Sequence, residues 1–389
     1  MRMQYKTIGE ICTVVSGTTP KSDKAEYWGG NLIWITPAEL KEGNAVIYDS
    51  VRHITKAAVK ASALKPFPKG TVILSSRAPI GKVAIAGTQM YCNQGFKNLI
   101  CSEVIYNGYL YYYLKAKTAY LNSLGRGATF REISKQIVEK IKIPVPSMQE
   151  QHRIADILFK IDALMGKRQQ QAEKLDELVK ARFVEMFGDP VRNTKQFPLV
   201  ELQDLYDVSS SKRVYQDEMV LDGIPFLRIS DIVEKSTNDK CTPQCFISQE
   251  MYDQLSQKGL TPNVGDILVT SRGTLGLCYE VKPGEKFYFQ DGMISWLYNR
   301  KDCVINTYLL YAFRLPGIRK QIDGSNDGST VSYLSIARLK RLKIELPPLA
   351  LQTEFSHFVH EVDRETERIQ RSAALLETLK RSLMQQYFG

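Results

Sequence analysis

The sequence from Ile141 to Gly188 reads IKIPVPSMQEQHRIADILFKIDALMGKRQQQAEKLDELVKARFVEMFG. Moved forward by 201 positions, it falls without a gap on LKIELPPLALQTEFSHFVHEVDRETERIQRSAALLETLKRSLMQQYFG, from Leu342 to Gly389. Two unrelated helices rarely share so many identities, so the match predicts an internal repeat. Identical pairs include Lys142 and Lys343, Pro146 and Pro347, Gln151 and Gln352, Asp162 and Asp363, Leu175 and Leu376, and Phe187 and Phe388.

The residues before these two segments also correspond, with small insertions. The matched stretches are 34–40 with 226–232, 70–77 with 265–272, 93–95 with 290–292, 107–110 with 306–309, and 127–129 with 328–330. Each half mixes short strand-like runs, such as TVILSS and GDILVTS, with Gly- and Pro-rich turns and a helical stretch, NGYLYYYLKAK or NTYLLYAFR. The sequence therefore predicts an α+β fold with two similar globular domains, residues 1–146 and 189–347, each followed by a long helix, residues 147–188 and 348–389.

Each predicted long helix carries apolar residues at alternating spacings of four and three, which is typical of a coiled-coil seam. The alternative is a helix that packs only on its own domain. About 40 residues at 1.5 Å each make a rod of roughly 60 Å, which is longer than such a domain can cover. We therefore expect the helices to pair as an antiparallel coiled coil. The predicted seam includes Ile154, Leu158, Ile161, Leu175 and Val179, and Phe355, Val359, Val362, Ile369 and Leu376.

The composition favours a folded protein with a polyanionic partner. Hydrophobic residues make up 43% of the chain, and the net charge is +10 with a pI near 9.1. Lysine and arginine release condensed counterions when they neutralise phosphates, so nucleic acid is the natural candidate. No run approaches the roughly 18 apolar residues of a membrane span, and the first residues lack the pattern of an export signal. We therefore expect a cytoplasmic protein without a membrane partner.

The seven cysteines predict neither a disulfide framework nor a metal site. Their number is odd, and the chain carries no sign of export. Cys241 and Cys245 are close in sequence, but no second pair or nearby histidine completes a tetrahedral zinc site.

Both long helices begin with the same short pattern: a proline, a glutamine five residues later, and an apolar residue three positions further on. These residues are Pro146, Gln151 and Ile154 in the first copy and Pro347, Gln352 and Phe355 in the second. With the duplicated plan over essentially the whole chain, this pattern resembles the specificity subunit of type I restriction-modification systems, in which two variable target-recognition domains alternate with two long helical regions. The second copy departs from the family's pattern, because Leu351 stands where the first copy has Glu150.

The resemblance implies a non-catalytic adaptor that reads a bipartite site in double-stranded DNA. Residues 1–146 and 189–347 would be its target-recognition domains. Two modification subunits would dock on the helices, bind S-adenosylmethionine and flip a target adenine out of the duplex in each half-site. Restriction subunits would supply translocation and cleavage that depend on ATP and Mg²⁺. No cofactor is therefore expected in this chain.

Two alternatives stay open on sequence alone. A nuclease or methyltransferase with built-in recognition domains needs a catalytic motif, yet the chain lacks an N/D-P-P-Y/F motif and a complete G-x-x-x-x-G-K-S/T loop, since Val83 follows Gly81 and Lys82. A structural coiled-coil protein would bind no duplex. Nuclease-like spacings join Asp266 to Glu280 and Lys282, and Asp23 to Glu39 and Lys41, at positions that are not equivalent in the repeat.

The loops supply the candidate DNA contacts. Base reading needs forked donors and amides, while phosphate contact needs cations and backbone amides from turns. Arg77 and Arg272 follow a serine in an S-R-x-x-x-G turn in both copies, which fits phosphate contact, although a shared structural role explains the turn equally well. The candidates are Lys21, Thr36, Ser76, Arg77, Lys97, Arg126, Thr129 and Arg131 in the first domain, and Lys212, Arg213, Arg228, Ser271, Arg272, Asn326, Ser329 and Thr330 in the second.

The predicted seam yields a test of spacing. One matched heptad inserted into both helices keeps the seam in phase and adds about 10 Å at 1.5 Å per residue. This length corresponds to roughly three more base pairs of unread spacer, while the half-site sequences should stay the same. A methylation map of the variant with its modification partner measures the spacer. An active variant that still marks the original spacer would show that the helices do not set it.

Overall fold

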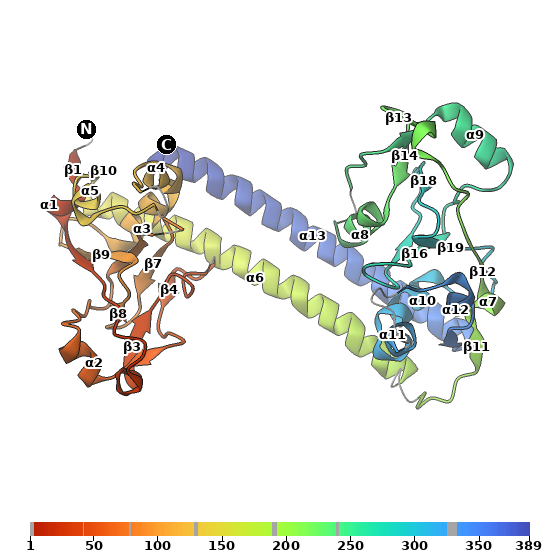
Figure 1. Ribbon diagram of the computed structural model, residues 1–389, viewed down its shortest axis with the longest axis horizontal. Coiled ribbons are helices and arrows are strands. Elements are labelled where there is room, and N and C mark those ends of the chain that lie inside the picture. The colour runs from red at the N-terminus through yellow and green to blue at the C-terminus, as the bar shows by residue number, and fades with distance from the viewer. Residues whose placement is uncertain are drawn as a thin grey trace. The chain divides into compact units, whose positions relative to one another are not determined.

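The chain divides into two compact units, Met1–Ala172 with Arg368–Gly389, and Glu173–Glu367. The computed structural model describes residues 4–41, 43–77, 79–127, 131–188, 193–238, 241–324 and 333–389 (Figure 1). Within these ranges, no helix is long and apolar enough to cross a membrane.

The first unit is built on a five-stranded sheet of order β2-β9-β6-β7-β4, a three-stranded sheet β5-β3-β8 and the pair β1-β10. Strand β6 is buried along its whole length, as its uninterrupted apolar run predicts. The elements are β1 (Tyr5–Thr7), α1 (Ile8–Ile11), β2 (Cys12–Ser16), β3 (Trp28–Ile35), β4 (Val46–Ile47), β5 (His53–Ile54), α2 (Lys56–Ala61), β6 (Val72–Ser75), β7 (Val83–Ala86), β8 (Tyr91–Cys92), β9 (Phe96–Cys101), α3 (Asn107–Ala116), α4 (Thr118–Ser123), α5 (Lys135–Glu139), β10 (Lys142–Pro144) and α6 (Met148–Phe187).

The second unit repeats this architecture with sheets of order β12-β19-β16-β17, β13-β15-β14-β18 and β11-β20. Its elements are β11 (Leu199–Glu201), α7 (Leu202–Leu205), β12 (Asp207–Ser210), β13 (Met219–Val220), β14 (Ile224–Leu227), α8 (Ile229–Asn238), β15 (Phe246–Ile247), α9 (Gln249–Gln257), β16 (Ile267–Thr270), β17 (Cys278–Glu280), β18 (Tyr288–Phe289), β19 (Ile294–Tyr298), α10 (Asn306–Arg314), α11 (Pro316–Asp323), α12 (Ile336–Lys340), β20 (Lys343–Glu345) and α13 (Leu349–Phe388).

The two units are copies of one fold, which confirms the predicted α+β duplication. The order of the core strands matches, with β9 and β19 each between an edge strand and a buried strand, β6 or β16. Strand β3 pairs in parallel with β8 as β14 pairs with β18. The copies differ after the end of β3 and β14, where the first carries the short strand β4 and the second carries the helix α8.

A buried glutamine explains the repeated pattern at the start of each long helix. Gln151 is fully buried, and its Oε1 accepts a hydrogen bond from the Tyr106 amide at 2.8 Å. Its Nε2 donates to the carbonyls of Val104 and Pro146, both at 3.0 Å. Gln352 makes the same three bonds, to the Ile305 amide and to the carbonyls of Cys303 and Pro347. The amide thus ties the first turn of the helix to the loop before α3 or α10.

The long helices pair in antiparallel fashion, as the seam predicted. In the first unit, the start of α6 contacts the end of α13: Lys380 lies 2.6 Å from Asp162, and Arg153 lies over the Tyr387 ring. In the second unit, the end of α6 contacts the start of α13, where Arg182 pairs with Glu354 at 2.7 Å. Eight of the ten seam residues are buried and Leu175 and Leu376 are half-buried.

The last aromatic residue of each helix completes a domain core. Phe388 of α13 packs against Tyr109 in the core of the first unit, at a ring separation of 5.4 Å. Phe187 of α6 occupies the equivalent place in the second unit, 4.9 Å from Tyr308. Packing on a domain and pairing between helices therefore coexist, since Ile154 also belongs to the core of the first unit.

The Gln151 network predicts a specific loss of stability. A Gln151→Met variant keeps the side-chain volume but removes the partner of the Tyr106 amide and of the Val104 and Pro146 carbonyls, which should cost about 2 to 4 kcal/mol. The midpoint of urea unfolding measures this cost. Gln170→Met, an exposed position on the same helix, is the control and should leave the midpoint unchanged. Equal midpoints for the two variants would contradict the structural role of Gln151.

Candidate DNA interface

In each domain, four loops meet where strands of both larger sheets end. We call this surface the loop rim; in the first domain it comprises residues 16–21, 36–41, 76–77, 79–81 and 93–95, and in the second residues 210–215, 228–231 with the first residues of α8, 271–276 and 290–293. Backbone hydrogen bonds join the loops: the Asn93 amide donates to the Ile35 carbonyl at 3.1 Å, and the Ser76 amide donates to the Gly95 carbonyl at 2.7 Å. The second domain repeats them between Gln290 and Leu227, at 3.0 Å, and between Ser271 and Met293, at 2.8 Å.

The S-R-x-x-x-G turn has the same construction in both rims. The Ser75 hydroxyl donates to the Pro79 carbonyl and accepts from the Lys82 amide, at 2.7 and 2.9 Å. Thr270 replaces Ser75 in the second domain and bonds in the same way. The turn closes on a glycine with positive φ, +91° at Gly81 and +69° at Gly276, a conformation that glycine adopts without strain.

Three of the predicted DNA contacts point inward instead. Ser76 and Ser271 are buried, and the Ser271 hydroxyl is hydrogen-bonded to that of Ser295 at 2.9 Å. Lys97 is 5% exposed, and its ammonium donates to the Ser76 hydroxyl and to Glu132, each at 3.2 Å. These three side chains therefore hold the rim together through internal hydrogen bonds, and their contact with DNA stays a prediction. Both serines directly follow a strand that is buried on both faces, and the sequence alone did not show that the burial extends into the turn.

The arginine of the turn is fixed differently in the two rims. Arg77 is exposed, and its Nε donates to the Glu132 carboxylate at 2.8 Å. Burial acts to raise the pKa of Glu132, but hydrogen bonds from Arg77 and Lys97 outweigh it and hold the pKa below its usual range. Glu132 is therefore ionised at neutral pH. In the second domain, Arg272 lies over the ring of Tyr333, with its Cζ 5.3 Å from the ring centroid.

The loop after β3 or β14 differs in charge between the two domains. Thr36 is half-buried, and both its amide and its hydroxyl donate to Glu39. Arg228 holds the equivalent position; its amide donates to Asp231 at 2.7 Å, while its side chain is exposed. The second rim thus gains a cation at a place where the first rim has a hydroxyl.

In each rim, a side chain of the first loop is hydrogen-bonded to a side chain that the sequence did not single out. In the first domain, the Thr19 hydroxyl is hydrogen-bonded to Oε1 of Gln94. In the second, Nε of Arg213 donates to Oδ2 of Asp291 at 2.9 Å. Gln94 and Asp291 were missed, although they are the differing middle residues of the matched stretches 93–95 and 290–292.

The remaining candidates are exposed or lie outside the described residues. Lys21 and Lys212 are exposed on the first loop of their rims, and Arg126 and Arg131 are exposed beside Glu132, whose backbone pairs with that of Arg126. The candidates outside the described residues are Thr129, Asn326, Ser329 and Thr330.

The nuclease-like spacing in the second domain forms no catalytic cluster. Asp266 is buried, and its Oδ2 accepts from the Trp296 indole at 2.9 Å and from the Asn263 amide at 2.7 Å. Burial raises the pKa of Asp266 above its usual value, against these two hydrogen bonds. Glu280 is bonded to Asn306. The carboxylates of the spacing are thus engaged in holding the domain together.

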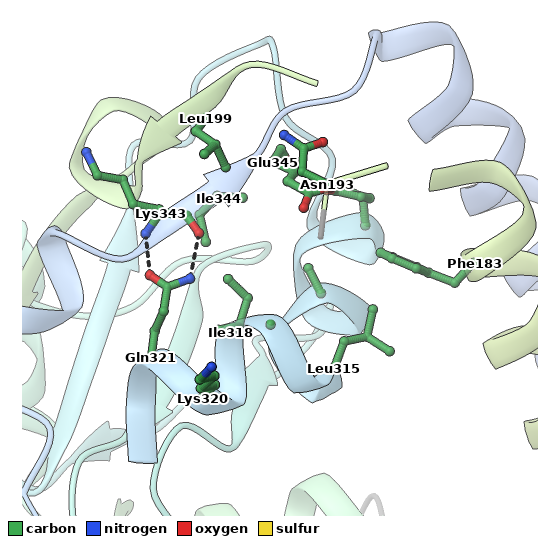
Figure 2. A pocket seen from close by; sticks show the side chains of 13 residues that line it. Phe183, Asn193, Leu199, Leu315, Ile318, Lys320, Gln321, Lys343, Ile344 and Glu345 are labelled. Atoms are coloured by element: carbon green, nitrogen blue, oxygen red, sulfur yellow. Dashed lines mark hydrogen bonds between the residues drawn. The ribbon is translucent and has the colours of Figure 1, made fainter. Parts of the chain in front are cut away.

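A cavity of about 470 Å³ lies in the second unit between α11 and β20 (Figure 2). Phe183, Leu315 and Ile318 give it an apolar wall. The Gln321 amide bridges to the backbone of Lys343 with bonds of 2.8 and 3.0 Å, so this polar side chain is committed to the strand. The described lining holds no nucleophile and general base in contact, and the cavity does not include the loop rim.

Comparisons with known proteins agree with this architecture. The family model described as the type I restriction modification DNA specificity domain matches twice, over residues 2–174 and 195–377. The type I restriction enzyme MjaIX specificity subunit of Methanocaldococcus jannaschii is 30% identical over 97% of this chain and 91% of its own length. A putative type I restriction enzyme specificity subunit of Haemophilus influenzae is 28% identical over 64% of this chain and 62% of its own length.

A solved structure supports the fold. The crystal structure of the type I restriction-modification S subunit from M. genitalium superposes with a TM-score of 0.59, at 16% identity, over 98% of this chain and 96% of that one. The two family matches, the long relative and this shared fold together explain the duplicated domains and helices. The chain belongs to the type I restriction-modification DNA specificity family, as a non-catalytic specificity subunit with two target-recognition domains.

Proposed function

We propose that the two loop rims are the surfaces that touch DNA, one for each half-site. The observation that carries this proposal is a constant backbone framework that carries different side chains in the two rims. The bonds from Asn93 to Ile35 and from Gln290 to Leu227 are equivalent, while the neighbouring positions carry Thr36 in one rim and Arg228 in the other. A recognition module that must read two different sequences needs a fixed frame and variable contacts.

Within the rims, Arg77 and Arg272 contact phosphates. Both are exposed at the same place of the S-R-x-x-x-G turn, and each is held on one side, by Glu132 or by Tyr333. A held guanidinium loses less side-chain entropy when it binds a phosphate. Lys21, Arg126, Arg131 and Lys212 add positive charge to the rims.

The phosphate role predicts a change in salt dependence. Arg77→Ala and Arg272→Ala should each lower the slope of log K against log salt by about 1, and should weaken specific and mixed-sequence duplexes alike. Fluorescence anisotropy with the complete modification complex gives these slopes. Lys69→Ala is the control, because Lys69 is exposed at the other end of β6. Unchanged slopes for both arginine variants would show that the rims are not the surface that binds DNA.

We further propose that two modification subunits bind this chain, one for each copy of the repeat. Leu178 on α6 and Leu379 on α13 are equivalent positions, and both are 48% exposed. Exposed leucines at repeated places fit two docking sites of the same kind. S-adenosylmethionine would be bound by the modification subunits, and ATP and Mg²⁺ by restriction subunits.

The two-site proposal predicts a stepwise loss of partners. Leu178→Arg and Leu379→Arg should each leave one modification subunit bound, and the double variant should leave none, since each buries a charge in one interface. Native mass spectrometry counts the subunits. Leu375→Arg should retain both, because Leu375 is exposed but its repeat position in the first copy is Lys174. A wild-type complex with one modification subunit would refute the proposal.

A further inference from the structure

Thr19 with Gln94, and Arg213 with Asp291, occupy equivalent places in the two rims. Thr19 lies three residues after the end of β2, as Arg213 does after β12. Gln94 lies two residues after the end of β8, and Asp291 two after β18. Each pair joins the first loop of its rim to the turn that precedes β9 or β19.

The backbone around the two pairs is the same, but the chemistry of the pairs is not. The strands that flank them keep their register, because Ser16 faces Lys97 as Ser210 faces Ser295. In one rim the pair is a hydroxyl with a carboxamide, and in the other it is an ion pair. An ion pair in contact with solvent contributes little to stability, so stability gives little reason for a pair at this place. Recognition of DNA gives a better reason, because both pairs are accessible to solvent and therefore to a bound duplex.

In each pair, polar atoms remain available for hydrogen bonds to a base. Gln94 is exposed, and among the described residues its Nε2 has no partner, so the carboxamide keeps a donor and an acceptor side by side. The side chain of Arg213 is 64% exposed, and only its Nε is bonded within the described chain. Its two terminal nitrogens remain as parallel donors.

These edges match different bases in the major groove. Glutamine pairs with adenine through N6 and N7, and arginine pairs with guanine through O6 and N7. The partner side chain orients the reader: Asp291 accepts from the inner nitrogen of Arg213 and leaves the fork free, and Thr19 holds the carboxamide of Gln94.

We propose that these pairs determine one base in each half-site, with Gln94 reading an adenine in one and Arg213 reading a guanine in the other. This inference rests on the proposed function, because it takes the rims as the DNA surface. The two domains thus use one equivalent pair of positions to read different bases, and the residue that reads the base lies on the turn in one rim and on the first loop in the other.

Exchange of the pairs tests the inference. Thr19→Arg with Gln94→Asp should change the preferred base at one position of one half-site from adenine to guanine, and Arg213→Thr with Asp291→Gln should make the reverse change in the other half-site. The preference should shift roughly tenfold or more. Sequencing of methylated sites, with the complete complex and its modification subunits, gives both half-sites.

Conservative single variants keep the test decisive if an exchanged pair fails to fold. Arg213→Lys keeps the charge but loses the fork, and Asp291→Asn keeps the shape but loses the charge that orients Arg213. Both should relax the requirement for guanine at the same position, with the salt slope of Arg213→Lys unchanged. A phosphate contact or a structural role would instead leave the recognised sequence intact in both variants, and that result would overturn the inference.

The same measurements separate this inference from the proposed function. If the recognised sequence stays intact while Arg77→Ala and Arg272→Ala still lower the salt slope, the rims contact DNA and these pairs do not read it. If the arginine variants also have no effect, the rims are not the DNA surface.

Discussion

One buried carboxamide at the start of each long helix fixes the rest of the structure. Gln151 and Gln352 each satisfy a backbone amide and two carbonyls with no exposed surface. A buried amide with all its hydrogen bonds made tolerates little change in geometry, because a lost bond leaves a desolvated polar group. The direction in which each helix leaves its domain is thereby set. The apolar seams of α6 and α13 can then face each other in only one rotational setting of the helices.

The loop rims follow a different rule, in which the backbone is specified and the side chains are free to vary. Ser75 and Thr270 hold their turns through the same two hydrogen bonds, so this position accepts either hydroxyl residue. The loops follow strands of the two larger sheets, of which β6, β8, β16 and β18 are buried throughout, and the loops carry the exposed cations. A substitution at Thr36 or Arg228 therefore changes the polar groups on the rim surface and leaves the packing of the hydrophobic core unchanged.

The sequence predicted the fold better than it predicted the site. The gapless match between the helical segments and the seam of period 3.5 both reflect long, regular constraints, and the structure confirmed the repeat and the antiparallel pairing. Individual side chains depend on local geometry that no pattern records. Ser76 precedes Arg77 in the same turn, yet one is buried and the other exposed. Gln94 and Asp291 could not be identified in this way, because a match between two copies identifies the positions they share, such as the glycine, and these two residues differ.

The placement of Phe388 has a consequence for synthesis on the ribosome. The core of the first domain includes this residue of α13, packed against Tyr109 of α3. The second domain receives its equivalent aromatic, Phe187, before most of its own strands are made. During translation, the domain that emerges first therefore waits longest for its core to be filled, while the later domain finds its helix already present. The nascent first domain keeps an apolar gap at Tyr109 until the end of α13 emerges, so its folding is coupled to the synthesis of that helix.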